Sequence, residues 1–262
     1  MALDIDRFAN LRSPIHQWDP RVKILSLFIL ILVVALIHTI PTALVALIAA
    51  ITLLKVTRIP ASFVIDGIKW VILFLLPFFI IMPMTYPGDA DFYILGLPFS
   101  WPGMQLASLI VIKAVAIVLT SYAIFGTSQF VVSMTALQRL KCPTVFVQML
   151  LFTYRYIFVL LDEMRRMDTA MKARGFVKKA NLYTLKVLGN FIGTLLIRSF
   201  ERTERIYKAM LSKGYNGQFH TLQTFKLVSS DYFKAIICVI FTIILITLDN
   251  TGLFNAAEQG WL

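Results

Sequence analysis

The chain has 262 residues, of which 58% are hydrophobic and only 15% are charged, and its mean hydropathy is +0.78. Soluble domains are about 45–50% apolar and about 25% charged, so this composition excludes an ordinary soluble protein and indicates an integral membrane protein. The formal net charge is +11, and the two cysteines form no C-x-x-C pair, so they support neither a disulfide framework nor a zinc cluster.

The first predicted helix begins at Asp19-Pro20, because aspartate is a favourable N-cap and proline is favoured at the first helical position. The apolar run 22–38 follows, and a second run covers 41–56 after a turn of a few residues. Both are near the lower length limit for crossing a hydrocarbon core of about 30 Å. We expect the two runs to form a hairpin of membrane spans.

Three further apolar runs complete five predicted spans. Run 68–85 contains Pro77 and Pro83, which should kink it near its far end. Residues 86–103 combine turn residues with an aromatic, proline-rich stretch, so they predict a loop at one membrane surface. Runs 104–125 and 232–248 are the fourth and fifth spans.

The segment 127–231 carries sixteen Lys and Arg against six Asp and Glu, so nearly all of the net charge lies there. Because positive residues stay on the cytoplasmic side, the N-terminus and this segment are predicted inside, and the loop 86–103 and the C-terminus outside. We therefore expect an all-α integral membrane protein in three regions. They are the N-terminal segment with spans one to four (1–126), a cytoplasmic region (127–231), and the fifth span with an external tail (232–262).

The cytoplasmic region predicts two long amphipathic helices, over about 143–173 and 182–211. Apolar residues recur at helical spacing, and opposite charges stand four residues apart on the other faces. The expected pairs are Asp162–Arg166, Asp168–Lys172, Glu201–Arg205 and Glu204–Lys208. At roughly thirty residues, or about 45 Å, each helix is too long and too charged at its far end to be a simple span.

Both helices end in the same pattern, A-M-x-[AS]-[RK]-G-[FY], at 170–176 and 209–215. Glycine adopts the left-handed C-cap conformation, and a cation is favourable at a helix C-terminus. One such end indicates only that a helix stops, or that a cation attracts lipid headgroups. Its duplication favours two similar heads for one partner with two similar sockets. The heads are formed by Ala173-Arg174-Gly175 and Ser212-Lys213-Gly214.

Lys113 lies inside the fourth apolar run, where a charge is a functional candidate by default. The alternative is that its side chain snorkels to the membrane surface, and both interpretations stay open. No His or carboxylate cluster, phosphate loop or hydrolase motif occurs, so we expect neither a metal site nor catalysis in this chain. The basic region is flanked by spans, which argues against a nucleic-acid partner.

Three motifs carry a resemblance to a known family. Ser13-Pro14-Ile15-His16-x-x-Asp19-Pro20-Arg21-x-Lys23 resembles the N-terminal signature of the transmembrane T component of energy-coupling factor (ECF) transporters. Two further motifs are similar to the cobalt/nickel branch, the CbiQ type. They are Thr153-Tyr154-Arg155-Tyr156 with the following Leu160-Leu161-Asp162-Glu163, and Arg198-Ser199-x-Glu201-Arg202-x-Glu204-Arg205-x-Tyr207-x-Ala209-Met210.

The resemblance implies a non-catalytic coupling subunit of an ATP-driven importer of cobalt or nickel in the cell membrane, serving cobalamin biosynthesis. Its coupling helices would end in Ala-Arg-Gly-like motifs that dock in grooves of paired ATPases. Ala173-Arg174-Gly175 matches that motif in full, whereas Ser212-Lys213-Gly214 departs at two of three positions. Lysine lacks the planar bidentate fork of arginine, so the second head is expected to bind less specifically.

The implied partners are two CbiO-type ATPase subunits, a CbiM-type metal-binding S component with or without a CbiN-type subunit, and the lipid bilayer. Mg-ATP and the transported metal would be bound by those subunits, and no cofactor by this chain. Three alternatives remain: a T component for vitamin S components, a self-contained channel or permease, and a membrane scaffold without an ATPase. A channel would need polar residues on several spans, and only Lys113 qualifies. The sequence does not distinguish cobalt from nickel as the transported metal. It also does not determine whether the two heads bind with equal affinity.

Overall fold

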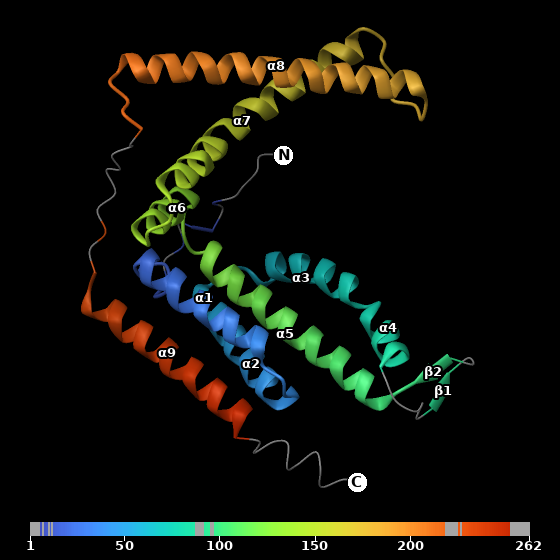
Figure 1. Cartoon of the computed structure of the whole chain (residues 1–262), viewed down its shortest axis with the longest axis vertical. Helices are drawn as coiled ribbons and strands as arrows, with labels where there is room; N and C mark the ends of the chain where they lie inside the picture. Colours follow the sequence, from blue (N-terminus) through green and yellow to red (C-terminus); the bar gives the residue numbers. More distant parts are fainter. Residues whose placement is uncertain are drawn as a thin grey trace. The chain divides into compact units, whose positions relative to one another are not determined.

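The structure is a computed structural model that describes residues 6, 8–9, 11, 13–86, 92–94, 97–217, 225 and 227–251 (Figure 1). The chain divides into two compact units. One, here called the bundle unit, comprises Ile5–Ala136 and Phe225–Leu262. The other, the arm unit, comprises Met1–Asp4 and Leu137–Thr224. The chain thus leaves the bundle unit after Ala136 and returns to it at Phe225.

The bundle unit is built from helices around α5. Its helices are α1 (Pro20–Leu36), α2 (Ile40–Thr57), α3 (Ala61–Leu75), α4 (Phe78–Thr85), α5 (Trp101–Phe125), the first part of α6 (Phe130–Arg139) and α9 (Ser229–Asn250). Helix α5 packs against α1, α2, α3 and α4, while α9 packs against α1 and α2 (Figure 1). Buried alanines such as Ala43, Ala46 and Ala116 lie in the core, where small side chains let helices approach closely.

The local start and break signals of the bundle unit are confirmed. Asp19 is the N-cap of α1, its carboxylate accepts from the Arg21 backbone N–H, and Pro20 follows at the first helical position. The third apolar run is interrupted at Pro77, which separates α3 from α4, whereas Pro83 lies inside α4 without ending it. Proline has no N–H to donate and its ring clashes with the preceding turn, so the helix cannot continue unbroken there.

The segment between α4 and α5 contains a two-stranded antiparallel hairpin that sequence reasoning missed. Strand β1 (Phe92–Ile94) pairs with β2 (Leu97–Phe99), and these are the only strands in the described part of the chain. The predicted turn at 87–91 lies outside the described residues. Ser100 ends the segment by capping α5, because its hydroxyl accepts from the Gly103 N–H.

The predicted all-α membrane fold is confirmed. The set of helices that qualify as spans differs from the prediction, because α7 is included and α1 is not. Among the described residues, five helical stretches are long and apolar enough to cross a membrane: α2, the α3–α4 stretch, α5, α7 (Thr144–Ala173) and α9. Helix α1 has 17 residues, about 26 Å at 1.5 Å per residue. Its outward side chains, including Leu25, Phe28 and Leu32, are nonetheless apolar, as contact with lipid requires.

The arm unit contains the two long helices. Helix α7 has 30 residues and α8 (Leu182–Ser212) has 31, so both predicted lengths are confirmed. Pro143 is the N-cap of α7, and the Asn181 side chain caps α8 by accepting from the Thr184 N–H at 2.8 Å. Figure 1 shows the two helices crossing. The N-terminal half of α7 is mostly apolar, and this is why the helix also qualifies as a membrane span. Its C-terminal half carries most of the charged residues.

Candidate functional site

The two predicted heads share one backbone conformation. Arg174 and Lys213 are the C-cap residues of α7 and α8, and the next residues, Gly175 and Gly214, have φ values of +80° and +82°. A residue with a Cβ is disfavoured in this left-handed region, so both positions favour glycine. The predicted left-handed caps are therefore confirmed at both ends.

Each cap also forms the same pair of hydrogen bonds. In α7, the Gly175 N–H donates to Lys172 O at 3.0 Å and the Phe176 N–H donates to Met171 O at 3.1 Å. This is the Schellman arrangement, which satisfies carbonyls that a helix end leaves unpaired. In α8, the equivalent bonds run from Gly214 N–H to Leu211 O at 3.0 Å and from Tyr215 N–H to Met210 O at 3.1 Å.

The cationic side chains of both heads are exposed. Arg174, Gly175, Lys213 and Gly214 are all exposed. Within the described part of the chain, neither the guanidinium of Arg174 nor the ammonium of Lys213 forms an ion pair. Each head therefore offers a cation, fixed to a rigid helix end, to an acceptor on another molecule.

The heads differ in how they are supported. Beside the first head lies a hollow of about 460 Å³, with Arg174, Phe176 and Tyr183 among its lining residues. At the second head, the Tyr215 hydroxyl donates to Gln148 Oε1 at 2.8 Å, and Gln148 Nε2 donates to Gly217 O at 3.1 Å. The second head is thus tied to the first turns of α7, a contact that sequence spacing could not reveal.

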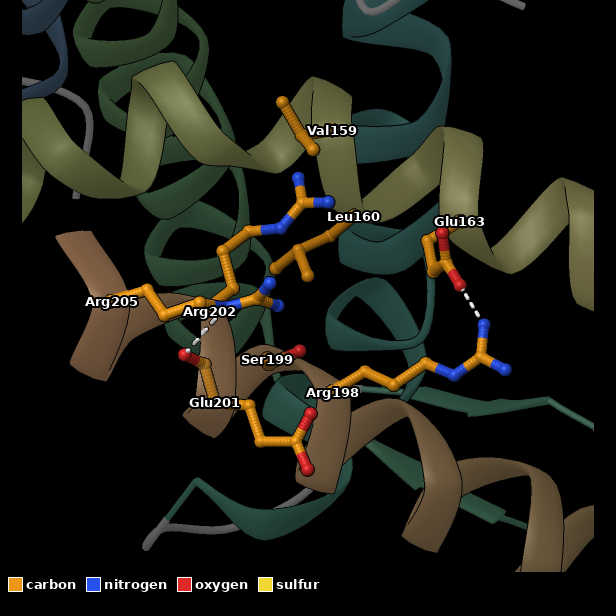
Figure 2. A pocket seen from close by; sticks show the side chains of 8 residues that line it. All are labelled: Val159, Leu160, Glu163, Arg198, Ser199, Glu201, Arg202 and Arg205. Carbon is orange, nitrogen blue, oxygen red and sulfur yellow. Dashed lines mark hydrogen bonds and ion pairs between the residues drawn. The ribbon is translucent and has the colours of Figure 1, made fainter.

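The crossing of α7 and α8 carries a cluster of charges (Figure 2). Glu163 of α7 points toward Arg198 of α8 and forms an ion pair with it. A pocket of about 290 Å³ lies beside the pair, and Arg202 and Arg205 are among its lining residues. Arg198 is part of a motif that the sequence singled out, but its partner is 35 residues away, so no local pattern indicated the pair.

The predicted pairs within each helix are confirmed in part. Asp168–Lys172 and Glu204–Lys208 are ion pairs at 2.6 and 2.8 Å. The Asp162–Arg166 prediction is wrong, because Asp162 pairs with Arg165 one residue earlier, at 3.6 Å. Arg205 Nε donates to the backbone oxygen of Glu201, at 3.3 Å, instead of to its carboxylate. All of these side chains lie along the surface, where neighbouring partners at i+3 and i+4 compete.

Lys113 lies in the bundle unit, half-buried on α5. Its Nζ donates to Ile37 O at 2.7 Å, the carbonyl of the C-cap residue of α1. The lysine therefore satisfies a carbonyl at a helix end, a role that neither sequence interpretation had considered. Among the described residues, no three or more His, Cys, Asp or Glu side chains are grouped so as to hold a metal ion.

Together these features define a multi-pass helical membrane protein whose two long helices end in matched cation–glycine heads. The sequence model of the CbiQ family, described as a cobalt transport protein, matches residues 12–224, which include both heads. The chain belongs to the CbiQ family and is a transmembrane T component of an energy-coupling factor transporter.

Similar proteins agree with this family. The energy-coupling factor transporter transmembrane protein EcfT of Bacillus subtilis is 26% identical over 226 residues, covering 81% of this chain and 84% of the relative. EcfT of Bacillus selenitireducens is 30% identical over 220 residues, covering 78% and 81%. An uncharacterized protein of Methanocaldococcus jannaschii is 27% identical over 255 residues, covering 94% and 86%. The similarity thus extends over most of each chain.

Proposed function

We propose that this chain is the non-catalytic coupling subunit of an ATP-driven importer of cobalt or nickel. In this role it joins two CbiO-type ATPase subunits to a CbiM-type S component, with or without a CbiN-type subunit. The observation that carries the proposal is the duplicated head. Two helices of similar length end in the same hydrogen-bonded cap, and each presents an exposed cation that is unpaired within the described residues.

The mechanism follows from the geometry of the arm unit. A pair of ATPase subunits has two equivalent sockets, and ATP-driven closure would bring those sockets, with the docked heads, together. Helices α7 and α8 are continuous, so a displacement at a head is carried along the helix instead of being absorbed by a loop. ATP hydrolysis and metal binding belong to the partner subunits, while this chain transmits the motion.

The exposed apolar face of α8 supports a membrane partner for the arm unit. Leu185, Ile192, Leu196 and Phe200 are between 55 and 72% exposed. Contiguous apolar surface of this kind indicates an interaction site or lipid contact. We assign it to the S component, whose metal site the motion of α8 would turn toward one or the other side of the membrane. The basic arm unit would lie at the cytoplasmic surface of the cell membrane.

Metal as the substrate is supported by the family description, cobalt transport protein. The EcfT relatives are named only as energy-coupling factor subunits, so a T component serving vitamin S components is the second candidate. Purified complexes in proteoliposomes would separate the two. We expect Co²⁺ or Ni²⁺ to accumulate only when ATP is hydrolysed, whereas ATP-dependent accumulation of a vitamin without metal would favour the alternative.

The docking role is tested by Arg174→Glu in the complete complex. In the docked complex the Arg174 guanidinium would be buried against the ATPase. Loss of such a buried charge contact costs about 2–5 kcal/mol of binding free energy, so recovery of the ATPase subunits with this chain should fall roughly thirtyfold or more. ATP-dependent uptake should be lost while the amount of chain in the membrane is unchanged. Arg166→Glu is the matched control, since it reverses an exposed arginine of α7 away from the head. Normal uptake by Arg174→Glu would contradict the assignment.

A further inference from the structure

Lys23 is completely buried in the bundle unit, with 0% of its surface exposed. Its ammonium donates to Thr127 Oγ1 at 2.9 Å and to Ser128 Oγ, and has a longer contact with Thr127 O at 3.5 Å. The Thr127 hydroxyl in turn donates to Ala123 O at 2.6 Å. Residues 127–128 follow the end of α5, where the helix dipole favours a cation. Lys23 therefore fixes the connection by which the chain passes from α5 to α6.

Asp19 and Arg21 contact the connection by which the chain returns. The Asp19 N–H donates to Asp231 Oδ1 at 3.4 Å, and Asp231 Oδ2 accepts from the Val228 N–H at 3.2 Å, just before α9. Both aspartates are buried. The guanidinium of Arg21 is held by the Asp19 carboxylate and lies 5.0 Å from the centre of the Phe225 ring. Two residues at the start of α1 thus contact the returning chain, at Asp231 and at Phe225.

The residues before α1 extend this fastening. His16 accepts from the Ser13 hydroxyl through Nδ1 and donates through Nε2 to Phe8 O. In the same N-terminal segment, Asp6 Oδ1 accepts from the Phe130 N–H at the first residue of α6, at 2.8 Å. Five polar side chains of the motif are therefore engaged inside the bundle unit, namely those of Ser13, His16, Asp19, Arg21 and Lys23.

The burial of Lys23 indicates that the connection it contacts must be held in one specific position. Taking an ammonium out of water is costly, and replacement of buried polar groups by apolar ones of similar shape is often neutral or stabilising. Packing alone would therefore be served as well by an apolar side chain at position 23. A lysine whose hydrogen bonds all reach one connection is instead suited to holding that connection in place.

We infer that the segment 13–23 is a positioning clamp for coupling. The chain passes from the bundle unit to the arm unit after Ala136 and returns at Phe225. At the start of α1, the clamp contacts Thr127 before the first of these crossings and Asp231 after the second. Motion of the arm unit then moves α1, α5 and α9 together instead of bending the connections. Lys23, Asp19 and Arg21 are positioning residues, since they bind no substrate. The inference rests on the proposed coupling function.

The test uses the whole transporter in proteoliposomes and measures ATP hydrolysis and Co²⁺ uptake in parallel. The double variant Lys23→Met with Thr127→Val replaces the buried polar link by apolar side chains of similar shape. We expect the complex to assemble and hydrolyse ATP, while uptake per ATP falls roughly fivefold or more, as expected for a lost coupling free energy of ordinary size. Thr127→Ser keeps the hydroxyl and should retain normal uptake per ATP. Lys69→Met controls for removal of an ammonium elsewhere in the bundle unit, because the exposed Lys69 pairs with Asp66 of its own helix, α3, and should keep normal uptake per ATP.

Unchanged uptake per ATP in the double variant would overturn the clamp and leave the proposed function intact. A failure of the proposed function would give a different result. In that case the Arg174→Glu variant would show normal association with the ATPase subunits and normal uptake. If the double variant does not fold, Arg21→Gln decides, because Arg21 is partly exposed and its loss removes only the contact with Phe225 and the pairing with Asp19. Reduced uptake per ATP in Arg21→Gln supports the clamp, and an unchanged ratio overturns it.

Discussion

Arg174 and Lys213 occupy equivalent positions on two helix ends, where the glycine and the following aromatic residue donate hydrogen bonds of the same lengths. The guanidinium can bind a carboxylate through two parallel hydrogen bonds, whereas the ammonium acts as a point charge. If both heads dock on an ATPase, Arg174→Lys should weaken association by about 1–2 kcal/mol, or roughly five- to thirtyfold. Lys213→Arg should retain or strengthen it. Pull-down of the ATPase subunits over a range of salt concentrations measures both, and an equal loss in the two variants would contradict the predicted asymmetry.

His16 gives the bundle unit a pH-dependent contribution to stability. Burial lowers its pKa below the ordinary value of 6.5, the hydrogen bond to Phe8 O acts in the opposite direction, and the charge of Lys23 lowers the pKa further. The unfolded chain therefore binds the proton more readily than the folded chain. The contribution is complete above pH 6.5 and is lost as the pH falls through the lowered pKa.

Thermal unfolding of the purified chain above and below pH 6.5 tests this expectation. The wild type should unfold at a lower temperature on the acidic side. His16→Gln cannot titrate, so its unfolding temperature should change less between the two conditions. Every other titrating group is common to both proteins, and an equal change in both would show that His16 does not contribute.

Among the helices and strands, sequence patterns predicted the features that depend on backbone sterics and on helical periodicity. The lengths of α7 and α8, the break at Pro77 and the glycine caps follow from local sterics and periodicity. The β1–β2 hairpin was missed because strands of three residues are too short for an alternating pattern to be recognised. The Glu163–Arg198 pair and the contacts of Lys23 were missed because their partners lie 35 and 104 residues away.

Glu163 and Arg198 link α7 to α8 at their crossing, so they bear on how the two helices move relative to each other. Their side chains are 20 and 56% exposed, and a pair of this kind contributes about 0.2–1 kcal/mol. Glu163→Arg and Arg198→Glu should each lower ATP-dependent uptake, because each places like charges together at the crossing. The double variant restores opposite charges and should recover much of the uptake.

A double-mutant cycle on uptake and on thermal unfolding separates the pair from its surroundings. Arg202 and Arg205 stay in place in every variant, so their field is common to the cycle. Additive effects of the two single substitutions would show that the crossing does not depend on this ion pair.

Helix α1 is fastened at both of its ends, and the two fastenings have different expected consequences. At its start, Lys23 and Asp19 contact the connections to the arm unit. At its other end, the Asp249 carboxylate of α9 accepts from the N–H groups of His38 and Thr39. Thr39 is the N-cap residue of α2 and His38 precedes it, so Asp249 supplies an acceptor for the N–H groups of the turn between α1 and α2. In the inferred clamp, only the first fastening would hold a route for motion, and the second should serve stability.

Asp249→Ala tests this separation. It leaves the His38 and Thr39 donors without their acceptor, which should cost about 1–3 kcal/mol and lower the unfolding temperature of the purified chain. Asp249→Asn keeps one acceptor oxygen and should lose less. In proteoliposomes both variants should retain uptake per ATP, in contrast to the Lys23→Met/Thr127→Val variant. A loss of uptake per ATP in Asp249→Ala without a loss of stability would mean that both ends of α1 transmit the motion, because a cap alone has no effect on coupling.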